Sequence, residues 1–153
     1  MSSKQSKSAR AIADVTFKLL ASCQEKEERI AENLSVTVSE FRCLRIFRGD
    51  RQLSIKTLIE RLDLSGSRLT RILDTLEKKG YLIRSIDPND RRSISVRLTK
   101  KGVELSSVLE KHYIEIHEEI LRGIPTSMHE ALISGLENLL KSLDEWLNNG
   151  NKQ

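Results

Sequence analysis

The sequence predicts a mainly helical chain with one small β-hairpin, an α+β fold, as a single domain over residues 1–153. Two observations carry this prediction. Apolar side chains recur at intervals of three and four residues along most of the chain, which is the period of an amphipathic helix. One segment, residues 81–98, instead carries a turn followed by alternating apolar and polar residues, which is the period of a strand.

The N-terminal part predicts three helices. Residues 1–7 are rich in Ser and Lys and are expected to be disordered, whereas residues 8–33 contain no Pro or Gly and predict a long helix. A second helix is predicted from about residue 38 to residue 48, with Ser39 as its cap. A short extended piece then precedes a third helix, which Ser54 can cap.

A fourth helix is predicted over residues 65–79. Ser65 is suited to cap its start, and Gly80 suits the left-handed position after its last turn. Its apolar stripe consists of Leu69, Ile72, Leu73 and Leu76. Two short helices joined by a three-residue turn, the second one basic on its outer face, form a helix-turn-helix.

The hairpin begins with turn residues and ends in a strand. Residues 87–90 are Asp-Pro-Asn-Asp, in which Pro presets φ while Asn and Asp tolerate tight turns. The strand alternates apolar with polar residues, so one wet face is expected: Ile94, Val96 and Leu98 against Ser93, Ser95 and Arg97.

Two further helices follow. The fifth is predicted to start at Lys100 and to end by Gly123, before Pro125. The sixth runs from about residue 126 to residue 148 with a long apolar stripe: Met128, Leu132, Leu136, Leu139, Leu140, Leu143 and Leu147. A helix of this length extends about 30 Å, further than the small preceding lobe could cover, so a second copy is the expected partner. The alternative is a helical cap over the core of a monomer.

Positive charge is concentrated in the helix-turn-helix and hairpin region. Residues 65–101 contain 10 Lys and Arg against 4 Asp and Glu, whereas residues 102–153 contain 4 against 9. A basic segment that coincides with a helix, a turn and a hairpin indicates a surface that meets a polyanion. The alternative for any single basic cluster is an ordinary solvated surface.

The run from Leu69 to Gly102 resembles the winged helix of the MarR (multiple antibiotic resistance regulator) family of bacterial transcription factors. Three parts carry the resemblance: the end of a recognition helix at Lys78-Lys79-Gly80, a wing tip at Asp90-Arg91-Arg92, and a strand ending Leu98-Thr99-Lys100-Lys101-Gly102. It implies a winged helix-turn-helix lobe over residues 38–99, with dimerisation helices at residues 8–33 and 100–149.

The resemblance also implies a homodimeric regulator, most often a repressor in this family, that binds double-stranded DNA at an inverted-repeat operator. Helix 65–79 would enter the major groove and wing 81–98 the minor groove. The residues expected to address base edges are Ser67, Arg68, Thr70 and Arg71. Ser65 and Lys56, at the starts of two helices, are expected to bind phosphates.

Two wing-tip arginines, Arg91 and Arg92, are expected at the minor groove, whose negative potential attracts arginine. In the family's Asp-x-Arg pattern the acid pairs with the arginine two positions on, so the resemblance implies that Asp90 orients Arg92. The alternative is that Asp90 completes the turn, and the two roles are compatible.

Enzyme, metal and redox functions are not expected. No Ser or Cys lies in a nucleophile motif, and His112 and His117 lie about 140° apart around a helix. A zinc site built from several helices stays an alternative through the family. Cys23 is followed by acidic residues, a setting in which a reactive thiol is not expected, and Cys43 is predicted to be a small buried residue. No cofactor is expected. Many members of the family bind small aromatic acids or phenols, but the sequence identifies no effector.

The start of the chain carries no targeting signal and the chain no membrane-length apolar run, so a cytoplasmic location and no membrane partner are expected. Two rival functions remain open from the sequence. One is an architectural DNA-binding protein without an effector. The other is a helical protein-interaction module whose basic hairpin binds an acidic protein or RNA.

Overall fold

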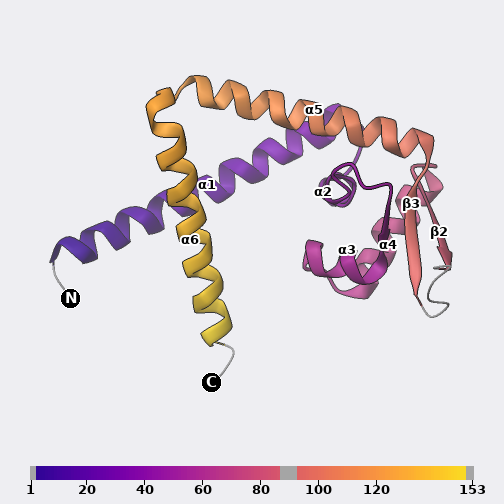
Figure 1. The fold of residues 1–153 in the computed structure, drawn as a ribbon, viewed down its shortest axis with the longest axis horizontal. Helices are drawn as coiled ribbons and strands as arrows, with labels where there is room; N and C mark the ends of the chain where they lie inside the picture. The colour runs from indigo at the N-terminus through magenta and orange to yellow at the C-terminus, as the bar shows by residue number, and fades with distance from the viewer. Residues whose placement is uncertain (1–2, 87–92, 151–153) are drawn as a thin grey trace. The chain divides into compact units, whose positions relative to one another are not determined.

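The computed structural model describes residues 3–86 and 93–150, which are mostly helical with one small antiparallel sheet (Figure 1). This confirms the predicted fold class. The elements are α1 (Ser3–Asn33), α2 (Val38–Ile46), β1 (Gln52–Ser54), α3 (Ile55–Leu62), α4 (Gly66–Lys78), β2 (Leu82–Ile86), β3 (Ile94–Leu98), α5 (Lys100–Arg122), a 3-10 turn η1 (Thr126–Met128) and α6 (His129–Gly150). The chain forms two compact units, residues 1–112 and residues 113–153.

Helix α1 begins at Ser3, so the expectation of disorder was wrong for residues 3–7 and the predicted start at residue 8 was too late. Lys4, Gln5 and Lys7 are good helix formers, and no Pro or Gly interrupts them. The Ser8 hydroxyl donates a hydrogen bond to the Lys4 carbonyl at 3.2 Å, which adds to the helical bonding of this first part.

Helix α2 is capped by Thr37, and the prediction of Ser39 as cap was wrong. The Glu40 amide donates to the Thr37 hydroxyl at 3.2 Å, and the Thr37 amide donates to the Glu40 carboxylate at 2.9 Å. This reciprocal pair is a capping box, whose Thr-x-x-Glu spacing is present in the sequence. The helix ends at Ile46, before the predicted residue 48, because Arg48 and Gly49 take left-handed backbone angles.

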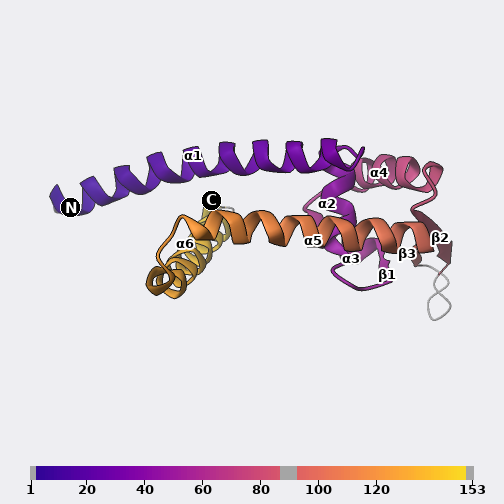
Figure 2. The same cartoon turned by 90° about the horizontal axis from the view of Figure 1, so that it is seen from above.

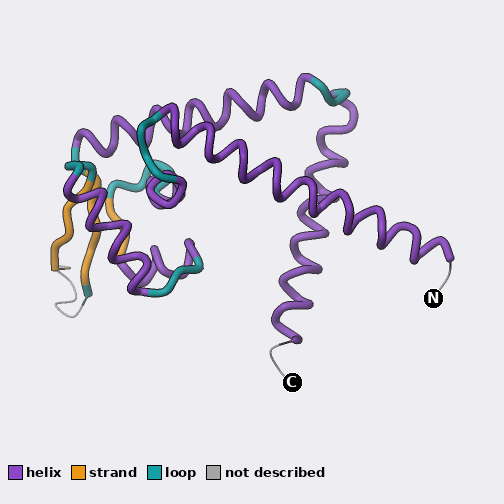
Figure 3. The backbone as a smooth tube through the Cα atoms, turned by 180° about the vertical axis from the view of Figure 1, so that it is seen from behind, coloured by secondary structure: helices purple, strands orange, loops and turns teal. Residues whose placement is uncertain are grey.

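A single hydrophobic core holds the helix-turn-helix lobe together. Helices α2, α3 and α4 lie together beside the strands, which are orange in Figure 3. The large side chains that are fully buried there are Phe41, Leu44, Phe47, Leu58, Leu69, Leu73, Leu76, Leu82, Val96 and Leu109. Burial of one such side chain contributes about 1.5–3 kcal/mol, so these residues dominate the stability of the lobe.

The sheet has three strands in the order β1-β3-β2. The sequence predicted the β2–β3 hairpin and a short extended piece before α3, but not that this piece pairs with β3 as strand β1. Leu53 of β1 pairs with Val96, and Leu82 of β2 pairs with Leu98. The expectation of one wet face on β3 was partly wrong, since Ser95 is 1% exposed and Ile94 is 49% exposed. Ser95 has a strand on each side, where Ser54 and Ser85 flank it, and this shields its small side chain.

Helix α5 has the predicted bounds, and the chain turns sharply after it at residues 123–128 before α6 (Figure 2). The first turn of the predicted sixth helix is the 3-10 turn η1. Along α6, all of which the structure describes, no residue is buried in the single chain. Its exposed large apolar residues are Leu132, Ile133, Leu136, Leu140, Leu143, Trp146 and Leu147. None of the helices within residues 3–86 and 93–150 combines the length and apolar character of a membrane span.

Candidate nucleic-acid interface

Helices α3 and α4 form the predicted helix-turn-helix. The Ser54 hydroxyl accepts a hydrogen bond from the Thr57 amide at 3.0 Å, which caps the start of α3. Asp63 ends α3 in the left-handed conformation with φ of 51°. Two residues later, the Ser65 hydroxyl accepts from the Arg68 amide at 3.4 Å and caps α4. Both predicted serine caps are therefore confirmed.

Helix α4 has one buried face and one exposed face. Leu69, Leu73 and Leu76 point into the core as predicted, and Ile72 is half-buried beside them. At about 100° per residue, Ser67, Arg71 and Lys78 lie near the middle of the opposite face. The helix thus presents a polar, basic surface that is carried on a rigid core.

The four residues predicted to address base edges are all exposed on the first two turns of α4: Ser67, Arg68, Thr70 and Arg71. The Thr70 hydroxyl donates to the Gly66 carbonyl at 2.9 Å, so its oxygen can still accept. The Ser67 hydroxyl lies 3.3 Å from that of Ser65. Within residues 3–86 and 93–150, the guanidinium groups of Arg68 and Arg71 have no hydrogen-bond or ion-pair partner, and both can meet a ligand.

The predicted phosphate ligands are placed at helix starts. Ser65 precedes α4, although its hydroxyl already serves as a cap. Lys56 is the second residue of α3 and is exposed, with its Nζ 4.0 Å from Glu60 Oε1. The predicted wing-tip residues Asp90, Arg91 and Arg92 lie outside the described residues.

One lysine after the recognition helix is engaged inside the protein. Lys79 Nζ lies 2.7 Å from the carboxylate of Glu40, which is 2% exposed. Burial raises the pKa of Glu40, but hydrogen bonds from Lys79, the Thr37 amide and Thr75, together with the charge of Lys79, outweigh it and hold this pKa below its ordinary value. This link was not predictable from the sequence, because its two residues are 39 positions apart.

A second lysine, Lys101, fastens the start of α5 to the same turn. Its Nζ donates to the Lys79 carbonyl at 2.9 Å and lies 4.5 Å from the centre of the Tyr81 ring. The Thr99 hydroxyl donates to the Gly80 carbonyl at 2.7 Å. Gly80 takes φ of 78°, as its predicted left-handed position requires. Part of the positive charge counted in residues 65–101 is thus used for folding.

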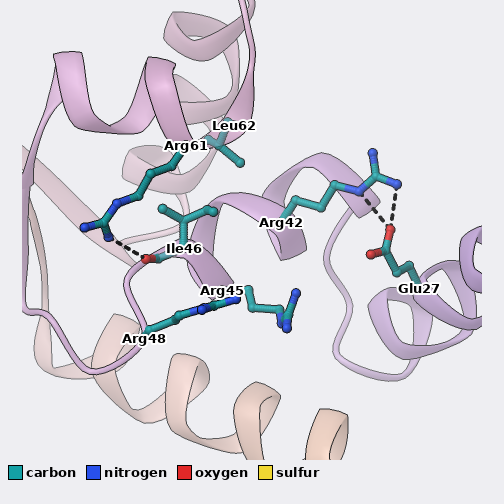
Figure 4. Close-up of a pocket in the computed structure, with 7 residues that line it drawn as sticks. All are labelled: Glu27, Arg42, Arg45, Ile46, Arg48, Arg61 and Leu62. Carbon is teal, nitrogen blue, oxygen red and sulfur yellow. Dashed lines mark hydrogen bonds and ion pairs between the residues drawn. The ribbon is translucent and has the colours of Figure 1, made fainter. Parts of the chain in front are cut away.

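An arginine-lined cavity of about 220 Å³ lies between α1, α2 and α3 (Figure 4). Arg42 contacts Glu27 at 2.6 Å, and Arg61 lies 3.7 Å from Asp50. Arg45 lies 4.0 Å from Glu110. Figure 4 shows the Arg42 guanidinium turned toward Glu27 and that of Arg61 toward the Ile46 carbonyl. These guanidinium groups are engaged by protein atoms, and the cavity identifies no effector.

Both cysteines are partly or fully buried, and one histidine contacts a main-chain carbonyl. Cys43 is buried, and burial, with the nearby Glu40 charge, raises the pKa of its thiol to about 12. Cys23 is half-buried on α1. His117 Nδ1 lies 2.6 Å from the Tyr113 carbonyl. No group of three or more metal-binding side chains is found among residues 3–86 and 93–150.

Comparison with known proteins agrees with this geometry. The model of the MarR family matches residues 36–94. The HTH-type transcriptional regulator SarZ of Staphylococcus epidermidis is 30% identical over 113 residues, which cover 72% of this chain and 74% of SarZ. SarZ of Staphylococcus aureus is 30% identical over 116 residues, which cover 76% of this chain and 77% of SarZ.

Solved structures share the fold. A mutant MarR from E. coli complexed with operator DNA has a TM-score of 0.64 and 27% identity, and the match covers 82% of this chain and 91% of that one. FabT of Streptococcus pneumoniae in complex with DNA has a TM-score of 0.77, with 90% and 99% covered, and at 20% identity this likeness shows the fold alone. The resemblance noted in the sequence is confirmed, and the chain belongs to the MarR family.

Proposed function

We propose that this chain is a sequence-specific regulator of transcription, acting as a repressor, that binds an inverted-repeat operator in double-stranded DNA as a homodimer. The observation that carries the proposal is the exposed basic face of α4, held by two capped helices over a fully buried core. In the proposed complex with DNA, α4 enters the major groove and the wing of residues 81–98 enters the minor groove. The operator complex of E. coli MarR supports this reading.

The exposed apolar face of α6 supports the homodimer. Monomeric proteins rarely expose large contiguous apolar patches, and a face this long on one helix indicates a partner. A second copy supplies the same face by two-fold symmetry, and symmetry then places two recognition helices about one turn of DNA apart. A cytoplasmic location follows from a role on chromosomal DNA, and a small aromatic or phenolic effector stays a prediction.

The function is tested by selecting duplexes from a random library and titrating the selected operator against a scrambled duplex by fluorescence anisotropy. We expect the selected sites to contain an inverted repeat. Equal affinity for operator and scrambled duplex would point instead to an architectural protein. No duplex binding at all would favour a protein-interaction module.

Base reading by α4 makes a separate prediction. Arg71→Ala or Arg68→Ala should reduce the preference for operator over scrambled duplex by about 1–3 kcal/mol. The reason is that the guanidinium of one arginine can form two hydrogen bonds with one guanine, which distinguish it from other bases. Arg10→Ala, an exposed arginine of α1, removes the same charge and should leave the preference unchanged. An equal loss of affinity for both duplexes in the α4 variants would assign these arginines to phosphates.

Oxidant is expected to leave DNA binding unchanged. The Cys43 thiol stays protonated because its pKa lies far above neutrality, and the thiolate is the form that peroxide attacks. Titrations before and after peroxide should agree for the wild type and for the protein with both Cys23→Ser and Cys43→Ser. A peroxide-dependent loss of binding that a single serine replacement abolishes would contradict this.

A further inference from the structure

Arg84 of β2 joins the hairpin to the recognition helix through two carboxylates of α4. Its Nη2 lies 2.6 Å from Asp74 Oδ1 and 2.5 Å from Glu77 Oε2, and its Nε donates to Glu77 Oε2 at 3.1 Å. The Arg84 main-chain amide donates to Glu77 Oε1, also at 3.1 Å. Both oxygens of Glu77 are therefore used, and we call these three residues the Arg84 clamp.

The surroundings of the clamp favour a persistent contact. The side chains of Arg84 and Glu77 are about one-third exposed and that of Asp74 somewhat more. Hydrogen bonds from Arg84 hold the pKa of Glu77 below its ordinary value, so the carboxylate is charged at neutral pH. Several charge-assisted hydrogen bonds from one planar guanidinium fix an orientation as well as a distance, which an exposed single pair does not.

The clamp lies where its geometry affects both parts of the DNA-binding surface. Asp74 and Glu77 are three positions apart, so they project one turn from each other on α4. Strand β2 pairs with β3 from Leu82↔Leu98 to Ile86↔Ile94, so the two strands move together as one hairpin arm. Whatever fixes β2 against α4 therefore fixes β3 with it.

We propose that Arg84 is a positioning residue for DNA binding, which sets the hairpin arm against the recognition helix so that both fit adjacent grooves in one pose. The proposal rests on the proposed function. Arg84 acts through Asp74 and Glu77, and its guanidinium faces protein and not DNA. The clamp is the counterpart, across α4, of the Lys79–Glu40 link that fastens the end of the same helix to α2.

Arg84→Lys is the variant that separates geometry from charge. Lysine keeps the positive charge but lacks the planar fork, so it cannot bind both carboxylates in the same way. We expect operator affinity to fall about tenfold, with the affinity for scrambled duplex and the salt dependence of binding unchanged. Arg29→Lys is the matched control, because Arg29 of α1 makes one exposed ion pair with Glu25 outside the helix-turn-helix and hairpin, and it should leave operator affinity unchanged.

Glu77→Gln tests whether the affinity for operator DNA rises or falls when the clamp loses a carboxylate. Simple Coulomb repulsion predicts that removal of a negative charge from α4 tightens DNA binding, whereas loss of the clamp predicts weaker operator binding. Tighter binding by Glu77→Gln, or unchanged operator affinity in Arg84→Lys, would overturn the proposal.

Thermal unfolding without DNA distinguishes a role of Arg84 in positioning the hairpin for DNA from a role in stabilising the lobe. A lower melting temperature with an unchanged operator preference, measured where each variant is folded, would show that the clamp only stabilises the lobe. If the wild type itself does not distinguish operator from scrambled duplex, the proposed function fails. A failure of positioning alone leaves the wild-type preference intact.

Discussion

Replacement of Gly102 by alanine is expected to destabilise the DNA-binding lobe by about 3 kcal/mol or more, because this site has no room for a side chain. A Cβ atom there would lie 1.9 Å from the Tyr81 carbonyl oxygen and 2.9 Å from its carbonyl carbon. The backbone cannot yield easily, since the Tyr81 carbonyl also accepts from the Thr99 amide at 3.0 Å. The Gly102 amide in turn donates to the Thr99 hydroxyl at 3.1 Å.

The measurement is the melting temperature by circular dichroism, which should fall by about 6–12 °C for a chain of this size. Gly150→Ala is the matched control, because a Cβ at Gly150 meets nothing within 4 Å. Operator affinity should fall in Gly102→Ala only if the turn at Tyr81 is displaced. An unchanged melting temperature in Gly102→Ala would mean that α5 starts in a different position.

Two glutamates on the apolar face of α6 are expected to convert the dimer to monomers. Leu136 and Leu140 are four positions apart on one face, and both are about half exposed in the single chain. Leu136→Glu with Leu140→Glu therefore costs the single chain little. In a dimer it would replace two buried leucines, each contributing about 1.5–3 kcal/mol, by charges, and the dissociation constant should rise at least about a hundredfold.

Analytical ultracentrifugation measures this change, and operator binding should be lost with the dimer. Ser134→Glu with Asn138→Glu adds two carboxylates at the same spacing on the opposite face of α6, and this protein should remain dimeric. A dimer that survives the Leu136 and Leu140 changes would place the interface on other helices.

The sequence predicted those parts of the lobe that depend on neighbouring residues. Ser54 and Ser65 cap helices that start one residue later, and Gly80 takes its left-handed angle within a turn of the helix it ends. Each of these signals lies within about four residues of its partner. The cap of α2 was assigned to Ser39 in error, although the spacing of Thr37 and Glu40 in the sequence is that of a capping box.

Contacts between residues far apart in sequence were not predictable. The β1–β3 pairing joins residues 52–54 to residues 95–97. The pattern of a three-residue strand is too short to indicate which strand it pairs with. The Lys79–Glu40 link and the Arg84 clamp likewise join separate elements, so these charges were counted as part of the DNA-binding surface. The exposed residues of α4 were predictable because helical periodicity alone separates them from the core.

The central position of β3 sets the order in which the lobe can form. Both β1 and β2 have β3 as their strand partner in the described sheet. Pairing of β1 with β3 closes a loop of about 40 residues that contains α3, α4 and β2. Helices form in about a microsecond from local contacts. Pairing of such distant strands is slower, because closing the loop between them lowers the conformational entropy of the chain before the contacts form. During synthesis the helix-turn-helix segment therefore leaves the ribosome before its sheet can exist, and the shortest N-terminal fragment able to fold as this lobe extends at least through Leu98.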